Sequence, residues 1–167
     1  MPGVLPRLRR FARTLARSPH DADDLAQNTI ERALARAAQW RPPAAGASPE
    51  QLEVAVRSWM FGIMKNAWID DRRAHGRERA VVTQDEALVL GAAEDSAHAL
   101  EERLSLEAAM ERLPDEQRLA IALVLVEGLS YQEAADLLQI PQGTLTSRLH
   151  RGREALTRQL ASAEASR

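Results

Sequence analysis

The chain has 167 residues, of which 45% are hydrophobic, 28% are charged and none is cysteine. This composition excludes a disordered protein, and the lack of thiols excludes disulfides and thiolate zinc sites. We expect a cytoplasmic protein without membrane insertion, because no stretch approaches about 18 continuous apolar residues. The net charge of −2 is unevenly distributed, with an acidic stretch at 80–113 between a basic first half and a basic segment at 142–158.

The first half of the chain is predicted to be helical. Ser18 and Pro19 are typical of the cap and first residue of a helix, which should end near Trp40. A second cap at Ser48 begins a helix that is apolar on more than one side, and we expect a separate helical piece with a basic end at 67–79. An amphipathic helix precedes both, and its apolar positions are Leu5, Leu8, Phe11, Ala12 and Leu15.

Two aromatic residues in this half allow two interpretations. Phe61 and Trp68 lie beside Lys65, Asn66 and a run of arginines. Aromatic and amide groups at a basic surface suit unstacked single-stranded bases, whereas buried rings are ordinary core residues. The residue types alone favour neither interpretation.

Residues 80–98 lack a sustained apolar period and are interpreted as a linker. A helical pattern returns at Ala99 and stops at Pro114, and Asp115 is expected to cap a further helix that Gly128 closes. No alternating apolar run with hairpin turns occurs in the sequence. We therefore predict an all-α fold of two small helical domains, at 1–79 and 99–162, with the linker between them and a tail at 163–167.

Two adjoining helices are predicted near the C-terminus. Ser130 and Glu133 form a capping-box pattern, so that a helix should begin at Tyr131. This helix cannot continue past Pro141, which is well suited to open a second helix. Two such helices joined by a tight turn are typical of a helix-turn-helix, whose second helix enters the major groove of DNA.

The second of these helices has an apolar face opposite a face of small polar and basic residues. Leu145 and Gly152 lie on the apolar face, which should pack on the core. Arg151 can make a forked contact to guanine, while Arg148 and Arg153 are placed for phosphates. A solvated amphipathic helix is the alternative, and the residue types favour DNA. The candidate duplex-binding residues are Thr146, Ser147, Arg148, His150, Arg151 and Arg153.

Catalytic and metal-binding motifs are not found in the sequence. The four histidines lack metal-ligand spacing, and no thiol could complete a site. No glycine-rich phosphate loop or nucleophile elbow occurs. We expect no metal, no cofactor and no enzymatic activity.

Three motifs occur in an order that resembles one known family. DADDLAQNTIERAL at 21–34 and RSWMFGIMKNAWIDDRRAHGR at 57–77 precede the acidic linker, and ERLPDEQRLAIALVLVEGLSYQEAADLLQIPQGTLTSRLHRGREAL follows at 111–156. Together they resemble the extracytoplasmic-function (ECF) sigma factors of bacterial RNA polymerase over nearly the whole chain. The last motif alone is also similar to response-regulator domains, but the two upstream motifs are not.

The resemblance implies a role for each domain. A region 2 domain would bind core RNA polymerase and the −10 promoter element, and a region 4 domain would bind the −35 element through its helix-turn-helix. The core polymerase would be contacted by Asp24, Gln27 and Asn28. The −10 contacts would come from Asn66, Arg72, Arg73 and Arg77, and the residue types beside them add Lys65 and Trp68 to this candidate set.

The resemblance also implies a mechanism and partners. Promoter DNA would be held at its phosphates and at a flipped base, with no bond made or broken by this chain. An anti-sigma factor would hold the protein inactive, and the free protein would be a monomer. The alternative is a helix-turn-helix regulator that acts without joining polymerase, which would bind a two-fold site as a dimer.

Overall fold

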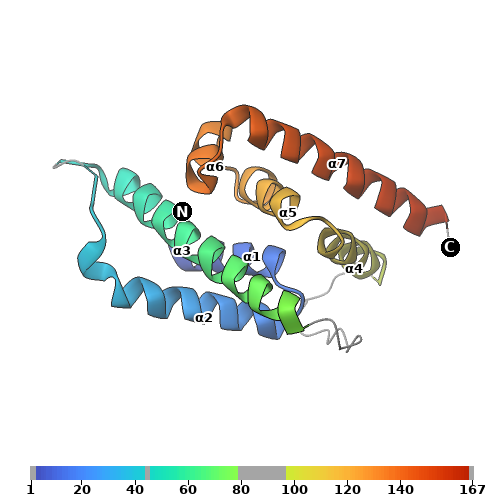
Figure 1. The fold of residues 1–167 in the computed structure, drawn as a ribbon, viewed down its shortest axis with the longest axis horizontal. Coiled ribbons are helices and arrows are strands. Elements are labelled where there is room, and N and C mark those ends of the chain that lie inside the picture. Colours follow the sequence, from blue (N-terminus) through green and yellow to red (C-terminus); the bar gives the residue numbers. More distant parts are fainter. Residues whose placement is uncertain (1–2, 44–45, 79–96, 166–167) are drawn as a thin grey trace. The chain divides into compact units, whose positions relative to one another are not determined.

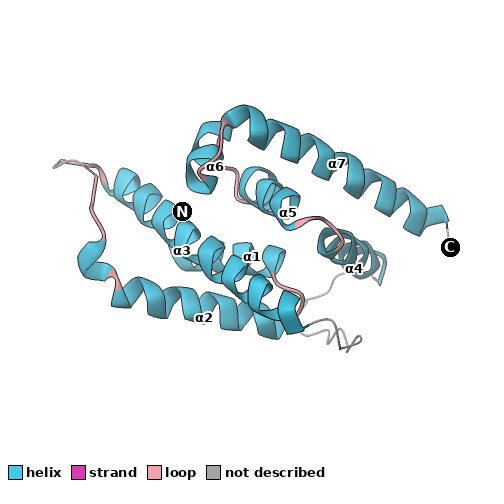
Figure 2. Cartoon of the chain, viewed as in Figure 1, coloured by secondary structure: helices cyan, strands magenta, loops and turns pink. Residues whose placement is uncertain are grey.

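The computed structural model describes residues 3–43, 46–78 and 97–165 (Figure 1). Within these ranges the regular structure is helical and no β-strand occurs (Figure 2), which confirms the all-α prediction. The chain divides into two compact units, Met1–Leu88 and Val89–Arg167. The predicted linker at 80–98 lies outside the described residues except for its last two, which are helical.

The described part of the first unit contains α1 (Val4–Leu15), α2 (Pro19–Ala35), the 3-10 turn η1 (Ala37–Gln39) and α3 (Pro49–Glu78). Ser18 caps α2 as predicted, because its Oγ accepts the backbone N–H of Asp21 at 3.0 Å. The helix expected after Ser48 and the separate piece expected at 67–79 form one continuous α3. This prediction of two helices was wrong because no proline or glycine stands between Ile63 and Ala67 to interrupt the hydrogen-bond ladder.

The core of the first unit lies where α1 packs on α3. Phe11 and Phe61 are fully buried, and their ring centroids lie 4.7 Å apart. Helix α2 contributes small residues to this core, including Ala22 and Ala26, so that its backbone can approach the other two helices closely. Of the five apolar positions predicted for α1, only Leu5 is exposed.

The described part of the second unit contains α4 (Ala97–Glu111), α5 (Asp115–Ile121), the π-helical turn η2 (Ala122–Val126), α6 (Tyr131–Leu138) and α7 (Gln142–Ala165). Asp115 does not cap α5, since Pro114 occupies the N-cap position and Asp115 is the first helical residue. Its carboxylate there still suits the positive end of the helix dipole. Gly128 closes the segment as predicted, with a φ of 70° that favours glycine.

Helix α7 is longer than predicted. It continues to Ala165, so that residues 163–165 of the expected tail are helical. The core that α7 covers includes Leu119 and Ile121 of α5, together with Leu145 and Leu149 of α7 itself. The position of the recognition residues therefore depends on how α5 supports α7.

Candidate nucleic-acid interface

Helices α6 and α7 form the predicted helix-turn-helix. The Ser130 Oγ accepts the backbone N–H of Glu133 at 3.2 Å, and a Glu133 carboxylate oxygen accepts the Ser130 backbone N–H at 2.8 Å. Helix α6 ends at Gln139, which has the left-handed φ of 56°. Glycine or asparagine is usual at such a cap, so no residue type marked the left-handed position, although Pro141 correctly predicted that the helix ends before it.

The capping box gives the first testable prediction. Replacing Ser130 with alanine removes the acceptor for the Glu133 amide and should lower the free energy of unfolding by about 1 kcal/mol. Urea denaturation followed by far-ultraviolet circular dichroism measures this loss. Thr157→Ala is the control, because that exposed hydroxyl only donates back to the carbonyl of Arg153 within α7. Equal stability of S130A and wild type would contradict the assigned cap.

The inner face of α7 packs where the sequence predicted. Leu145 and Leu149 are buried, as is Gly152. A Cβ atom at Gly152 would lie 2.7 Å from Cδ1 of Ile121 and 3.3 Å from Cβ of Gln117. The two helices therefore pack closely at a residue that has no side chain.

The outer face of α7 presents most of the predicted duplex-binding residues. Ser147, His150 and Arg151 are exposed, as are Thr146 and Arg153. The Arg151 Nε donates to the Ser147 carbonyl oxygen at 3.3 Å, which aligns the guanidinium along the helix. Its terminal N–H groups are the pair that a forked contact to guanine uses. This face can therefore offer both base-edge and phosphate donors to a major groove.

Arg148 differs from the other predicted contacts. Its side chain is only 19% exposed, and its Nη2 lies 2.9 Å from Oε2 of Glu116 in the first turn of α5. His150 also lies near a carboxylate, with Nε2 3.5 Å from Oε1 of Glu154, but both of those side chains are more than half exposed. Sequence reasoning did not select Glu116, because the contact joins two helices far apart in the chain.

The predicted −10 residues lie near the C-terminal half of α3. Asn66 and Arg73 are exposed, while Lys65 and Arg72 are half-buried. Burial lowers the pKa of Lys65, because desolvation disfavours the ammonium form. Arg77 lies in α3, but its side chain is outside the described residues. This part of α3 thus combines an amide with several cationic groups.

Trp68 is a core residue, which corrects its prediction as a DNA contact. It is 3% exposed, and its indole N–H donates to the Leu15 carbonyl oxygen at 3.0 Å. Phe61 is likewise buried against Phe11, so neither ring can stack on a base. The guanidinium of Arg72 instead lies over the Trp68 ring, 5.5 Å from its centroid. Trp68 therefore contacts the half-buried guanidinium of Arg72 through a cation–π interaction.

The predicted polymerase contacts are on the exposed side of α2. Asp24, Gln27 and Asn28 are all exposed. The Gln27 amide donates to a Glu31 carboxylate oxygen at 3.0 Å, and His20 lies 3.6 Å from Asp24. Leu34 is 72% exposed at the end of the same helix. This helix thus presents polar and apolar groups that its own unit does not bury.

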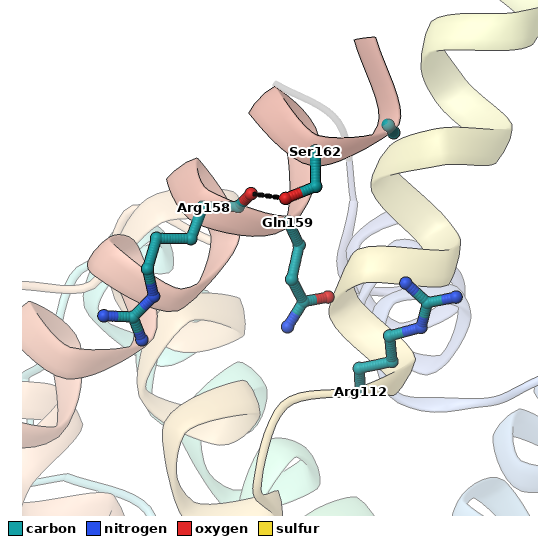
Figure 3. Close-up of a pocket in the computed structure, with 5 residues that line it drawn as sticks. Arg112, Arg158, Gln159 and Ser162 are labelled. Atoms are coloured by element: carbon teal, nitrogen blue, oxygen red, sulfur yellow. Dashed lines mark hydrogen bonds between the residues drawn. The ribbon is translucent and has the colours of Figure 1, made fainter. Parts of the chain in front are cut away.

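A groove not predicted from the sequence lies between the last turns of α7 and the end of α4 (Figure 3). Its volume is about 460 Å³, and it is lined by Arg112, Arg158, Gln159, Ser162 and Ala163. The Ser162 hydroxyl donates to the Arg158 carbonyl oxygen at 2.8 Å. The described residues contain no cluster of side chains suited to a metal ion, and no helix among them is long and apolar enough to cross a bilayer.

Both units match models of known protein domains. Residues 2–65 match the Sigma2 domain of PhyR, and residues 103–156 match Sigma-70, region 4. An all-α chain in which both units match sigma domains, and whose helix-turn-helix carries basic residues, belongs to the class of sigma-like transcription proteins. The second match covers α5, α6 and all six predicted duplex-binding residues of α7.

Full-length relatives define the family more narrowly. The chain is 33% identical to the ECF RNA polymerase sigma factor EcfG of Rhodopseudomonas palustris, over 92% of this chain and 79% of that one. It is 32% identical to SigE of Mycolicibacterium smegmatis over 93% of this chain, but spans 58% of that longer protein. The chain therefore belongs to the ECF sigma factor family.

A solved structure supports the fold over almost the whole chain. The sigma factor RpoE, crystallised with the anti-sigma factor NepR from Bartonella quintana, aligns with a TM-score of 0.74 and 29% identity. The alignment covers 95% of this chain and 92% of that one.

Proposed function

We propose that this protein is an alternative sigma factor that joins core RNA polymerase in the cytoplasm and directs initiation at specific promoters. The single observation that carries the proposal is the exposed face of α7, with Ser147, His150 and Arg151, in a chain that belongs to the ECF sigma factor family. The domains at 1–79 and 99–162 would act as regions 2 and 4, and 80–98 would tether them.

The second unit would recognise the −35 element as duplex DNA. Arg151 would bind guanine with its forked donors, and Ser147 and His150 would add single hydrogen bonds to base edges. Arg153 is exposed and would contact a phosphate, which sets the register of the helix. Thr146 is also exposed, and its hydroxyl donates to the Gln142 carbonyl oxygen at 2.9 Å, so that its oxygen can still accept from a donor on DNA.

The first unit would bind the −10 element after strand separation. Asn66 would capture a flipped base, because an exposed amide can both donate to and accept from a Watson–Crick edge. Arg72, Arg73 and Arg77 would hold the backbone, with Arg72 supported by the Trp68 ring. Asp24, Gln27 and Asn28 would contact the polymerase, which supplies all of the chemistry of RNA synthesis.

An anti-sigma factor is the second proposed partner. The Bartonella quintana sigma factor that resembles this chain was crystallised with such a protein. Exposed apolar residues, including Leu5 and Leu34 in the first unit and Leu106 in the second, suit a partner that covers each unit. The free protein would be a monomer.

Run-off transcription tests the proposed function. Core RNA polymerase with this protein should initiate from a subset of a promoter library, and the enriched sequences should share two elements. Core enzyme alone is the control. A dimer that binds a two-fold duplex site without polymerase, and no initiation in the presence of core enzyme, would instead identify a helix-turn-helix regulator.

Replacing Arg151 with alanine should lower transcription from the enriched promoters by about five- to 150-fold, because a forked arginine–guanine contact contributes about 1–3 kcal/mol. The loss should be largest at promoters with the selected base opposite Arg151. Arg158→Ala is the matched control, since Arg158 is an exposed arginine on the same helix outside the predicted contact set. Unchanged transcription by R151A would exclude Arg151 as a base-reading residue.

A further inference from the structure

Glu116 lies in a helix to which no DNA contact is assigned, yet it engages a cation of the recognition helix. Its Oε2 is 2.9 Å from Nη2 of Arg148, within the range of a charge-assisted hydrogen bond. Glu116 itself is 65% exposed, whereas Arg148 is 19% exposed. The aliphatic part of Arg148 is therefore packed by the second unit, and its charged end meets the carboxylate near solvent.

The location of Arg148 on α7 explains why the two residues meet. It stands three residues after Leu145 and one before Leu149, both of which are buried against the core. At about 100° per residue, Arg148 therefore lies on the flank of α7 rather than on its outermost line. A guanidinium on this flank has a carboxylate beside it and reaches a DNA phosphate only by turning outward.

A carboxylate and a phosphate present the same kind of acceptor to a guanidinium. An N–H group of Arg148 that donates to Glu116 is not available to DNA, and the carboxylate repels a nearby phosphate. We infer that Glu116 is an intramolecular competitor that occupies Arg148 in the free protein and yields it to the DNA backbone on binding. This inference rests on the proposed function, because it requires α7 to bind duplex DNA.

The ion pair between Arg148 and Glu116 is weak enough to be exchanged for a contact between Arg148 and a DNA phosphate. Ion pairs near the protein surface are weak, since water and salt screen them, and a polyanion can replace such a partner. The Arg148 side chain is mostly buried, so that packing contributes to its position in addition to the carboxylate. The competition is consequently modest, and its removal should raise duplex affinity by about two- to fivefold.

A double-mutant cycle tests this inference with the full-length protein. The probe is a fluorescent random-sequence duplex of about 30 base pairs, because phosphate contacts do not depend on sequence. Anisotropy titrations at low salt compare wild type, E116Q, R148A and the double variant. E116Q should bind about two- to fivefold more tightly than wild type, and should give no gain in the R148A background. The gain should shrink at high salt, where ion pairs are screened.

Glu154→Gln is the matched control for the removal of one negative charge. E154Q removes one negative charge beside His150, whereas E116Q removes one beside an arginine. Circular dichroism of each variant verifies that the fold is kept. Weaker binding by E116Q would show that the carboxylate orients Arg148 for DNA. An equal gain in affinity with and without Arg148 would show that the carboxylate repels DNA in general. Either result would overturn the inference that Glu116 competes with DNA for Arg148. If wild type fails to bind duplex and also fails in run-off transcription, the proposed function falls, and this inference falls with it.

Discussion

Replacing Trp68 with alanine is expected to destabilise the Met1–Leu88 unit by about 3–5 kcal/mol, the range for a large aromatic residue removed from a core. Trp68 is 3% exposed, so the variant would leave a cavity between α1 and α3. The Leu15 carbonyl would also lose its indole donor. A loss of this size approaches the whole stability of a small domain, and transcription should fall with it.

Tryptophan fluorescence during urea unfolding measures this effect selectively. The tryptophans of the chain are Trp40, Trp59 and Trp68, and all belong to the first unit. In W68A the emission of Trp40 and Trp59, whose ring centroids lie 6.2 Å apart, still reports that unit. Trp68→Phe is the control, because it keeps most of the ring volume and removes the hydrogen bond. Its free energy of unfolding should fall by about 1–2 kcal/mol. Stability of W68A within about 1 kcal/mol of wild type would refute a core role for Trp68.

Gly152→Leu should disrupt the second unit and leave the first one folded. A Cβ atom alone would approach Ile121 to 2.7 Å, and leucine adds further carbons at the same place. Overpacking of this kind usually costs about 1–3 kcal/mol, occasionally more, and here it would separate α7 from α5. Recognition of the proposed −35 element should be lost, because α5 would no longer hold the outer face of α7 in position.

The two units allow this prediction to be checked with two signals. Far-ultraviolet circular dichroism should lose the helical contribution of the second unit at a lower temperature, whereas the tryptophan transition of the first unit should not move. Gly152→Ala is the control, since the Ile121 methyl group can turn away and alanine favours a helix by about 1 kcal/mol over glycine. Identical melting of G152L and wild type would mean that α5 and α7 do not meet at this point.

Local sequence signals predicted those features that depend on neighbours in the chain. The caps at Ser18 and Ser130 were confirmed, because each side chain bonds an amide three residues away. The inner and outer faces of α7 also followed from helical periodicity alone. The order of motifs led to the family, which the relatives confirm. The individual contacts to DNA and polymerase stay predictions.

Features that depend on contacts between helices could not be predicted from local sequence signals. Trp68 stands among basic residues in the sequence, yet its direction on α3 is set by packing against α1. The pair of Arg148 with Glu116 joins residues that no periodic pattern connects. Gly152 was correctly assigned to the inner face, but its contact with Ile121 required the relative position of α5 and α7.

The unbroken course of α3 fixes a distance along the first unit. Asn66 and Arg73 are seven residues apart, so they lie on one side of the helix and about 10 Å apart along its axis. In two separate helices this spacing would vary with the hinge between them. In one continuous helix it is constant, so that under the proposed function a base held by Asn66 and a phosphate held by Arg73 would keep a set separation along the DNA strand.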